Sequence, residues 1–436
     1  MSAQANSGST AQSSGPSPSG GSTTDQISTP QRRRTGQIGM GIAVAIAVVL
    51  FLVGIGGGYA LESYLHKSST TTIDITETGS SLLYPLMHYY WGPNFTAANS
   101  NIVLSTASTG SGTGQTDANE SLVNIGASDG YYTPAKADGL LNVPVAISAQ
   151  LVYYNLPGVT AHLNLNGTIL GLIYMGKITS WNNAWIQAAN PTVTLPSNTI
   201  VPLKRADSSG DTFLFSSFCD MSLKNWSYGV SNTALSGTSW TGETGNSGMV
   251  AGLNSTAYSI AYVGISYEAA ANATSAHLQY AALGDNESLS ASGGVVASNY
   301  VLPYPASISN DANLGLKHLN FAADQLEVTL ILGGSYAGPT TLVAGAGGTN
   351  NASGLPAYPI ANLEYNIVRI APVSASGSVV TSAALAATVT FLEWAISYGN
   401  YAAGGGESTW LSTVHFQPLT PEVIGYDQQE IAQISP

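Results

Sequence analysis

The chain has 436 residues, of which 44% are hydrophobic and only 8% are charged, and its formal net charge is −13. This length allows two or three domains with a sizeable core in each. A net negative chain lacks the basic face that tracks a phosphodiester backbone, which argues against nucleic acid as a partner. Cys219 is the single cysteine and the six histidines show no metal-ligand spacing, so we expect no disulfide, no metal and no cofactor.

The N-terminal part predicts a membrane anchor. Residues 1–37 are rich in Ser, Gly, Thr and Gln, and we expect a disordered cytoplasmic tail. Residues 38–61 carry no charge and follow three arginines, so they predict a transmembrane helix with the rest of the chain outside the cell. The alternative is a cleaved signal peptide, because the most apolar core covers only 42–55. Residues 62–72 would form a stalk.

Potential glycosylation sites agree with an external location. Eight Asn-X-Ser/Thr sequences follow the expected anchor, and each is compatible with a glycan on an extracellular surface. They begin at Asn94, Asn119, Asn166, Asn225, Asn254, Asn272, Asn286 and Asn351.

After the stalk, strand-like and helical patterns alternate along the chain. The expected strands are 73–76, 102–106, 123–127, 145–155, 199–203, 260–263 and 365–370, and the expected helices are 82–91, 168–175, 180–189, 213–223 and 384–398. Each of the first three strands ends in a small polar turn, a pattern typical of an α/β sheet with its site at the carboxyl edge. Residues 285–358 predict loops with a few short elements such as 325–332.

A strand, a polar turn and a helix at 199–223 predict an anion site. Ser209 and Gly210 stand in the turn at the helix start, where backbone N–H groups lack helical partners. Arg205 precedes them, and a guanidinium can grip a tetrahedral oxyanion with two parallel donors. Arg205 and Arg369 are the only arginines beyond residue 61. The alternative is an ordinary capped helix with a surface arginine.

A set of short motifs runs in one order over residues 75–425. They include Gly79-Ser80-Ser81, Gly110-Ser111-Gly112, Gly126-Ala127-Ser128-Asp129, Ile173-Tyr174-Met175-Gly176-Lys177-Ile178, Arg205-Ala206-Asp207-Ser208-Ser209-Gly210, Gly245-Asn246-Ser247-Gly248 and Phe391-Leu392-Glu393-Trp394-Ala395. Together they resemble the phosphate-binding proteins of ABC phosphate importers.

The resemblance implies an α/β, two-domain, hinged solute-binding fold of the type II periplasmic-binding-protein kind. Domain I would comprise 73–148 and 360–436, and domain II would comprise 149–359. Inorganic phosphate would bind in the cleft between the domains and pass to an ABC permease. The protein would then be a receptor and not an enzyme.

The resemblance also implies the phosphate-binding residues. Domain I would supply Ser81, Leu82, Ser111 and Asp129, and domain II would supply Arg205, Ser209, Gly210 and Asp211. Leu82 would donate through its backbone. Asp129 would accept a hydrogen bond from a protonated phosphate oxygen and would repel sulfate, which has no proton to donate near neutral pH.

Two residues depart from the family pattern. Leu82 stands where Phe is usual, and Asp211 stands where Thr normally follows the Ser-Gly turn. Asp211 has two interpretations. It points away from the site and caps the helix, or it points inward as a second carboxylate, in which case the favoured ligand is dihydrogen phosphate.

Other function classes remain open. The same fold could bind another oxyanion, such as arsenate, or serve as a non-transport structural or adhesion protein of the cell surface. A hydrolase would use Ser209 as its nucleophile, but no Gly-X-Ser-X-Gly elbow surrounds this serine.

Overall fold

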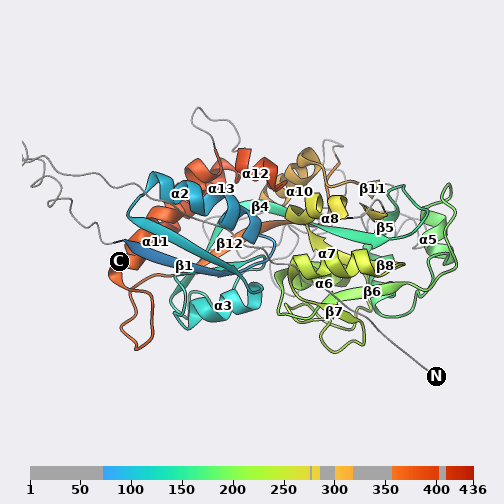
Figure 1. Cartoon of the computed structure of the whole chain (residues 1–436), viewed down its shortest axis with the longest axis horizontal. Coiled ribbons are helices and arrows are strands. Elements are labelled where there is room, and N and C mark those ends of the chain that lie inside the picture. The colour runs from blue at the N-terminus through green and yellow to red at the C-terminus, as the bar shows by residue number, and fades with distance from the viewer. Residues whose placement is uncertain (1–71, 275–276, 285–299, 318–355, 402–408) are drawn as a thin grey trace, which may run out of the picture. The chain divides into compact units, whose positions relative to one another are not determined.

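A computed structural model of the chain describes residues 72–274, 277–284, 300–317, 356–401 and 409–436 (Figure 1). They belong to one compact unit, Thr70–Pro436. Within these ranges no helix is both long and apolar enough to cross a bilayer. The expected tail, the anchor at 38–61, nearly all of the stalk, the element at 325–332 and the sequons at Asn286 and Asn351 lie outside the described residues.

Strands and helices alternate along most of this unit. The strands are β1 (Ile73–Gly79), β2 (Ile102–Ser108), β3 (Ile125–Ser128), β4 (Leu140–Asn155), β5 (Asn164–Asn166), β6 (Val201–Arg205), β7 (Thr241–Glu243), β8 (Ser259–Gly264), β9 (Leu278–Tyr280), β10 (Ala282–Gly284), β11 (Tyr300–Val301) and β12 (Ala361–Arg369). The helices are η1 (Leu86–Trp91), α2 (Gly92–Ala98), α3 (Ser111–Asn119), α4 (Gly167–Tyr174), α5 (Ala184–Ala189), α6 (Gly210–Ser222), α7 (Gly245–Ser255), η2 (Ile265–Tyr267), α8 (Glu268–Thr274), α10 (Pro305–Lys317), α11 (Ser382–Trp394), η4 (Ala395–Gly399), α12 (Thr409–Thr413) and α13 (Pro421–Ile431).

One mixed sheet organises the described residues. Its order is β2-β1-β3-β12-β4-β8-β6-β7, and β9 also pairs with β4. The pairs of β1 with β2 and with β3 are parallel, as are those of β6 with β7 and with β8. Parallel strands bring their carboxyl ends to the same edge, so the sheet offers one such edge in each half.

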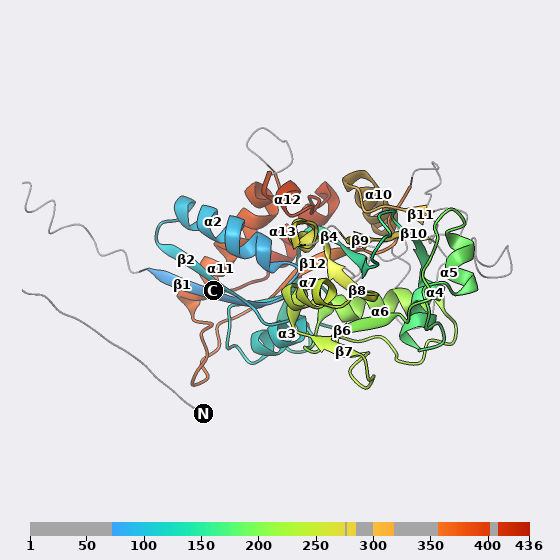
Figure 2. The ribbon, with the colours of Figure 1, turned by 45° about the vertical axis from the view of Figure 1, so that its right-hand side comes forward.

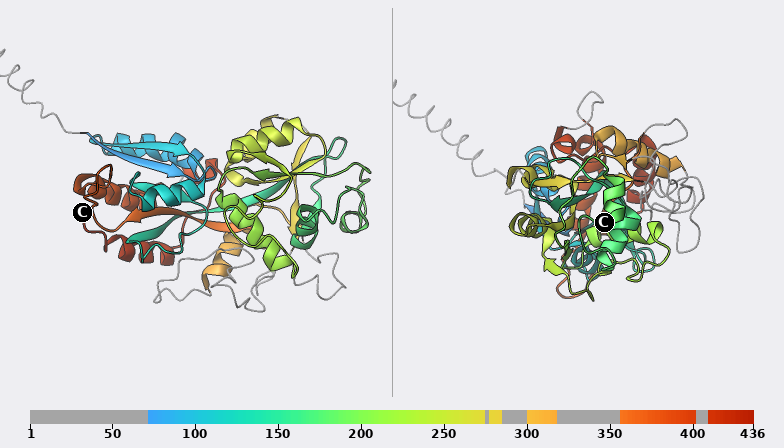
Figure 3. Two further views of the ribbon diagram at one scale, coloured as in Figure 1. Left: turned by 90° about the horizontal axis from the view of Figure 1, so that it is seen from below. Right: turned by 90° about the vertical axis from the view of Figure 1, so that its right-hand side faces the viewer.

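The long strand β4 joins the two halves of the sheet. Its first part pairs with β12, from Leu140 opposite Arg369 to Ala149 opposite Ala361. Its last part pairs with β8, where Gln150 lies opposite Gly264. Nearly all of β4 is buried, which explains its mainly apolar sequence. Figures 1 and 3 show β4 running from the elements near α3 and α11 to those near α6 and α7.

Helices cover each half of the sheet. Helices α3 and α11 pack against β1, and α6 and α7 pack against β6 and β8 (Figure 2). Helix α6 buries Leu214, Phe215, Phe218 and Cys219. Full burial of a Phe or Leu side chain stabilises the fold by about 1.5–3 kcal/mol. This apolar face therefore fixes α6 against β6 and β8.

Most expected elements are confirmed with shifted ends, but three expectations were wrong. The helix expected at 180–189 begins only at Ala184, because Ser180 forms a β-bridge with Thr199 and Asn183 caps the helix. Part of 285–358 forms the 13-residue helix α10 instead of a loop. The sequon at Asn166 cannot carry a glycan in this fold, because its buried side chain caps α4 by accepting from the Ile169 N–H.

Candidate functional site

Three predicted residues come together at the carboxyl edge of the first sheet half. Strands β1, β2 and β3 are parallel neighbours in the sheet. Ser81 follows β1, Ser111 begins α3 after β2, and Asp129 follows β3 directly. The strand topology therefore places two hydroxyl groups and a carboxylate beside one another, as the polar turns in the sequence predicted.

Asp129 is buried, and its side chain and its backbone each bond to a serine hydroxyl. The Ser80 hydroxyl donates to Asp129 Oδ1, and the Asp129 N–H donates to Ser111 Oγ at 3.2 Å. Burial, followed by the charge of Asp211, raises the pKa of Asp129 to about 7. Glu364 of β12 lies next to it, and burial raises the pKa of Glu364 well above its ordinary value. These two carboxyl groups therefore retain a proton in conditions where exposed carboxyls are ionised.

Arg205 ends β6 at the carboxyl edge of the second half and is buried. Its Nε donates to Asp207 Oδ1 at 2.8 Å, and its Nη1 donates to Asp211 Oδ2 at 2.7 Å. Burial disfavours the guanidinium charge, but the bond to Asp207 and the charge of Asp211 raise the pKa of Arg205 overall. Burial raises the pKa of Asp207, but the hydrogen bond and the charge of Arg205 lower it, and the overall shift is downward. Arg205 is thus a fixed cation between two carboxylates.

The structure decides between the two interpretations of Asp211. Its side chain is fully buried and faces Arg205, and Ser209 is the N-cap of α6, so Asp211 does not cap the helix. Its carboxylate also accepts from Asn246 Nδ2 at 2.7 Å and from Gln150 Nε2 at 3.1 Å. Burial raises the pKa of Asp211, while Arg205 and these donors lower it. Asp211 points into the site.

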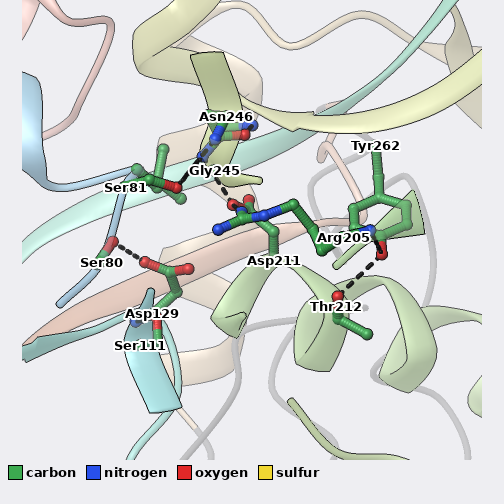
Figure 4. A network of polar contacts seen from close by, with 12 residues as sticks. Ser80, Ser81, Ser111, Asp129, Arg205, Asp211, Thr212, Gly245, Asn246 and Tyr262 are labelled. Carbon is green, nitrogen blue, oxygen red and sulfur yellow. Dashed lines mark hydrogen bonds and ion pairs between the residues drawn. The ribbon is translucent and has the colours of Figure 1, made fainter. Parts of the chain in front are cut away.

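Asn246, at the start of α7, connects the two groups of residues (Figure 4). Its N–H and its Nδ2 donate to Ser81 Oγ at 3.2 Å and 3.0 Å, and the same Nδ2 reaches Asp211. Its Oδ1 accepts from the Gly264 N–H at 2.8 Å. One amide therefore links the end of β1 to the start of α6 through hydrogen bonds.

The two groups also touch through glycines. A Cβ on Gly210 would lie 2.5 Å from both Asp129 Oδ2 and Ser111 Oγ. The Gly112 N–H donates to the Ser208 carbonyl at 3.0 Å, and a Cβ on Gly112 would lie only 1.9 Å from Ser208 Oγ. Glycine is therefore required at these positions by the close approach of the opposing chain.

The hydroxyl of Ser209 remains unused among the described residues. It is buried, and its Oγ has no hydrogen-bond partner there. A buried hydroxyl without a partner costs about 1–3 kcal/mol. Ser209 is placed at the start of a 13-residue helix, where backbone N–H groups also lack helical partners. The arrangement can accept an anion with hydroxyl and N–H donors. No cluster of three or more potential metal ligands occurs within the described ranges.

The structure brings together seven of the eight predicted residues. They are Ser81, Ser111, Asp129, Arg205, Ser209, Gly210 and Asp211. The eighth, Leu82, follows Ser81 with a buried side chain that packs against Gly264. Its proposed role belongs to its backbone, and that role stays a prediction.

The network also contains residues that the sequence-based prediction omitted. Asp207 and Asn246 stand within two of the motifs, so the motifs contained a signal for them. Ser80 is adjacent to a predicted residue. Gln150 and Glu364 are polar residues within buried strands, each two positions from another polar residue, Ser148 or Asn362, and this polar alternation in a buried strand was their only signal.

Residues 66–330 match the family described as the PBP superfamily domain, and this match covers more than half of the chain. The chain belongs to the PBP superfamily. Its two-domain α/β fold, expected from the motifs, is therefore confirmed. Within this superfamily, relatives and solved structures indicate a more specific similarity.

This superfamily member is similar to curated phosphate-binding proteins. It is 27% identical over 363 residues to the phosphate-binding protein PstS of Xylella fastidiosa (strain 9a5c), covering 81% of this chain and 84% of the relative. It is 32% identical over 200 residues to PstS of Haemophilus influenzae, covering 44% of this chain and 58% of the relative. A solved human phosphate-binding apolipoprotein shares the fold, with a TM-score of 0.57 and 19% identity over 82% of this chain and 94% of that one. The resemblance to phosphate-binding proteins is confirmed.

Proposed function

We propose that this chain is a phosphate receptor that captures inorganic phosphate between its two domains and delivers it to an ABC permease. The similarity to the phosphate-binding proteins of Xylella fastidiosa and Haemophilus influenzae supports this function. The observation that carries it is the meeting of the two sheet edges: Asp129 lies against Gly210 at the start of α6, and Asn246 hydrogen-bonds both Ser81 and Asp211, the partner of Arg205. Such a site offers charge, donors and one selective acceptor to a tetrahedral anion.

Each part of the network has a role in this proposal. Arg205, the Ser209 hydroxyl and the free N–H groups around Gly210 would donate to phosphate oxygens from domain II. Ser81, Ser111 and the Leu82 backbone would donate from domain I. The unpartnered Ser209 hydroxyl supports this assignment, because a bound oxygen would satisfy it.

Asp129 would provide the selectivity. When ionised it can only accept hydrogen bonds, so it pairs with a phosphate oxygen that carries a proton. Sulfate offers no proton, and it would place an unpaired negative charge against a buried carboxylate. Rejection therefore follows from repulsion and from the lost hydrogen bond.

Capture would proceed by hinge closure. Domain I is expected at 73–148 and 360–436, and domain II at 149–359. The chain would cross between them once in β4, near Ala149, and once in β12, near Ala361, and these two residues pair in the sheet. Phosphate would favour the closed state because only there do both domains contact it.

The receptor would act outside the cell beside its permease. Residues 38–61 would anchor it in the membrane, and the stalk at 62–72 would set its reach and raise its effective concentration near the permease. Among the described residues, four sequon asparagines are exposed and could carry glycans: Asn94, Asn225, Asn254 and Asn272.

Calorimetric titration of the full chain tests the proposal. Before titration the protein is cleared of carried-over ligand with a phosphate-consuming enzyme system. Inorganic phosphate should bind with micromolar or tighter affinity, sulfate should give no response, and arsenate, which is also tetrahedral and protonated, should compete with phosphate. If phosphate and arsenate both fail to bind the folded protein, the receptor function is wrong and a structural role at the cell surface is favoured.

A further inference from the structure

The carboxylate of Asp211 occupies hydrogen-bond donors that an anionic ligand would otherwise use. Its Oδ2 accepts from Arg205 Nη1 and from Asn246 Nδ2, both at 2.7 Å, and its Oδ1 accepts from Gln150 Nε2 at 3.1 Å. Asp211 has no exposed surface. It is therefore a built-in counterion at the centre of the proposed site and not a solvated side chain.

The charge of Arg205 is already balanced without a ligand. Asp207 accepts from Nε and Asp211 accepts from Nη1, so two carboxylates share one guanidinium. The charged and titratable groups that face this cluster come from β6, the turn after β6, the end of β3, β12, β8 and η2. They are Arg205, Asp207, Asp129, Glu364, Tyr262 and Tyr267.

A phosphate dianion would raise the negative charge of this cluster further. The dianion keeps a single O–H group, which can pair with Asp129 or with Asp211 but not with both, so one of the two carboxylates would face an unprotonated oxygen. In a buried site such like-charge contacts are weakly screened. Binding of the dianion would then require a proton from solution.

Dihydrogen phosphate removes this conflict. It has two O–H groups, one for Asp129 and one for Asp211, and its two remaining oxygens can accept from donors such as Ser209 Oγ and the N–H groups at the start of α6. Its two O–H groups match the two buried carboxylates, Asp129 and Asp211, that would face the ligand, and the hydrogen bond from Arg205 leaves Asp211 able to accept another. Burial also raises the pKa of both Asp129 and Asp211, which agrees with sites that hold a proton in the complex.

We infer that Asp211 is a specificity-determining residue that restricts the ligand to dihydrogen phosphate, so that each captured phosphate carries two protons into the site. The inference rests on the proposed function and deepens it. A threonine or an asparagine in place of Asp211 could donate a hydrogen bond to an unprotonated oxygen of the dianion. Either substitution would therefore allow the dianion to bind.

Calorimetry of the full chain with inorganic phosphate, from about pH 5 to about pH 9, tests the inference. Wild type is compared with Asp211→Asn and Asp211→Thr, in buffers of different ionisation enthalpy so that proton uptake is counted directly. Asp220→Asn is the matched control, because Asp220 lies on the exposed face of the same helix.

We expect wild-type affinity for total phosphate to fall about tenfold per pH unit above the second pKa of phosphate, with one proton taken up per phosphate. Asp220→Asn should behave like wild type. Both Asp211 variants should bind with a shallower pH dependence and with less proton uptake.

The outcomes separate this inference from the function on which it rests. Constant wild-type affinity above neutral pH overturns the inference and leaves the phosphate receptor standing, whether or not the variants fold. An equal dependence of phosphate affinity on pH in wild type and in both folded Asp211 variants also overturns the inference. The proton taken up on binding would then belong to a group other than Asp211. Wild type that binds no phosphate at any pH refutes the proposed function itself.

Discussion

Arg205 Nη1 lies 2.7 Å from the carboxylate of Asp211, only six residues further along the chain. The same guanidinium contacts Asp207 through Nε at 2.8 Å. Because all three residues lie in one strand–turn–helix segment, from the end of β6 to the start of α6, the local fold fixes the plane and charge of the cation. Removing one member of such a buried group leaves the others unpaired, so single variants act on both binding and stability.

Replacing Arg205 by lysine should weaken phosphate binding. Lysine keeps the charge but cannot reproduce the planar fork, and the loss of a charge-assisted hydrogen bond of about 1.5–3 kcal/mol predicts roughly ten- to hundredfold lower affinity. Calorimetric titration with phosphate measures it. Arg369→Lys is the matched control, since Arg369 bonds to Ser121 Oγ at 3.1 Å and has no contact with the network. Equal losses in both variants would contradict a specific role for Arg205.

Replacing Asp129 by asparagine should let sulfate bind. The amide can donate to an unprotonated oxygen where the carboxylate could only repel it, so the phosphate-to-sulfate affinity ratio should fall by about tenfold or more. Competition of sulfate against bound phosphate is the measurement, and Asp74→Asn, at an exposed position of β1, is the control. If the Asp129→Asn variant still ignores sulfate, selectivity lies elsewhere.

Adding a methyl group at Gly210 should weaken binding and stability together. The new Cβ would lie 2.5 Å from Asp129 Oδ2 and Ser111 Oγ, so these groups must move apart, at a cost of about 1–3 kcal/mol. Thermal unfolding of Gly210→Ala with and without phosphate measures both effects. Gly237→Ala is the control, because no atom lies within 4 Å of its Cβ position. Unchanged phosphate affinity in Gly210→Ala would mean that this close approach is not part of the bound state.

Replacing Asp427 by asparagine should stabilise the protein at alkaline pH. Asp427 is fully buried on α13, its carboxyl oxygens have no hydrogen-bond partner among the described residues, and burial followed by Glu430 raises its pKa well above the ordinary value. A raised folded-state pKa favours the protonated form in the fold. The buried carboxyl therefore costs no stability through its ionisation below about pH 4, the pKa of an unfolded aspartate. This cost grows as pH rises toward the folded-state pKa.

Denaturant unfolding at acid and alkaline pH measures this effect. Asp427→Asn should gain about 1–3 kcal/mol relative to wild type at alkaline pH and much less at acid pH. Glu422→Gln, at an exposed position in the first turn of the same helix, should show no such gain. A gain that is equal at both pH values would rule out ionisation of Asp427 as its cause.

Local sequence patterns were sufficient for much of the fold and of the site. Alternating strands and helices, polar turns after three strands, and the segment from Arg205 to Gly210 predicted an α/β sheet with an anion site at its carboxyl edge. These features depend on residues within a few positions of one another, since N–H groups at a helix start and a neighbouring arginine are set by local geometry. The expected helix at 180–189 was partly wrong because the bridge between Ser180 and Thr199 is not local.

Only the tertiary structure decided what surrounds the anion site. The direction of Asp211 was ambiguous in the sequence, because the same residue type caps a helix or pairs with a cation. Its partners Gln150 and Asn246 are 61 and 35 residues away, and Glu364 meets Asp129 through the pairing of β12 with β3. Such contacts exist only once the strands are ordered in the sheet. The sequence by itself therefore determined which groups could bind an anion. The sheet order decided which further carboxylates, Asp129 and Glu364, lie near the pair of Arg205 and Asp211, because charges act through space and not along the chain.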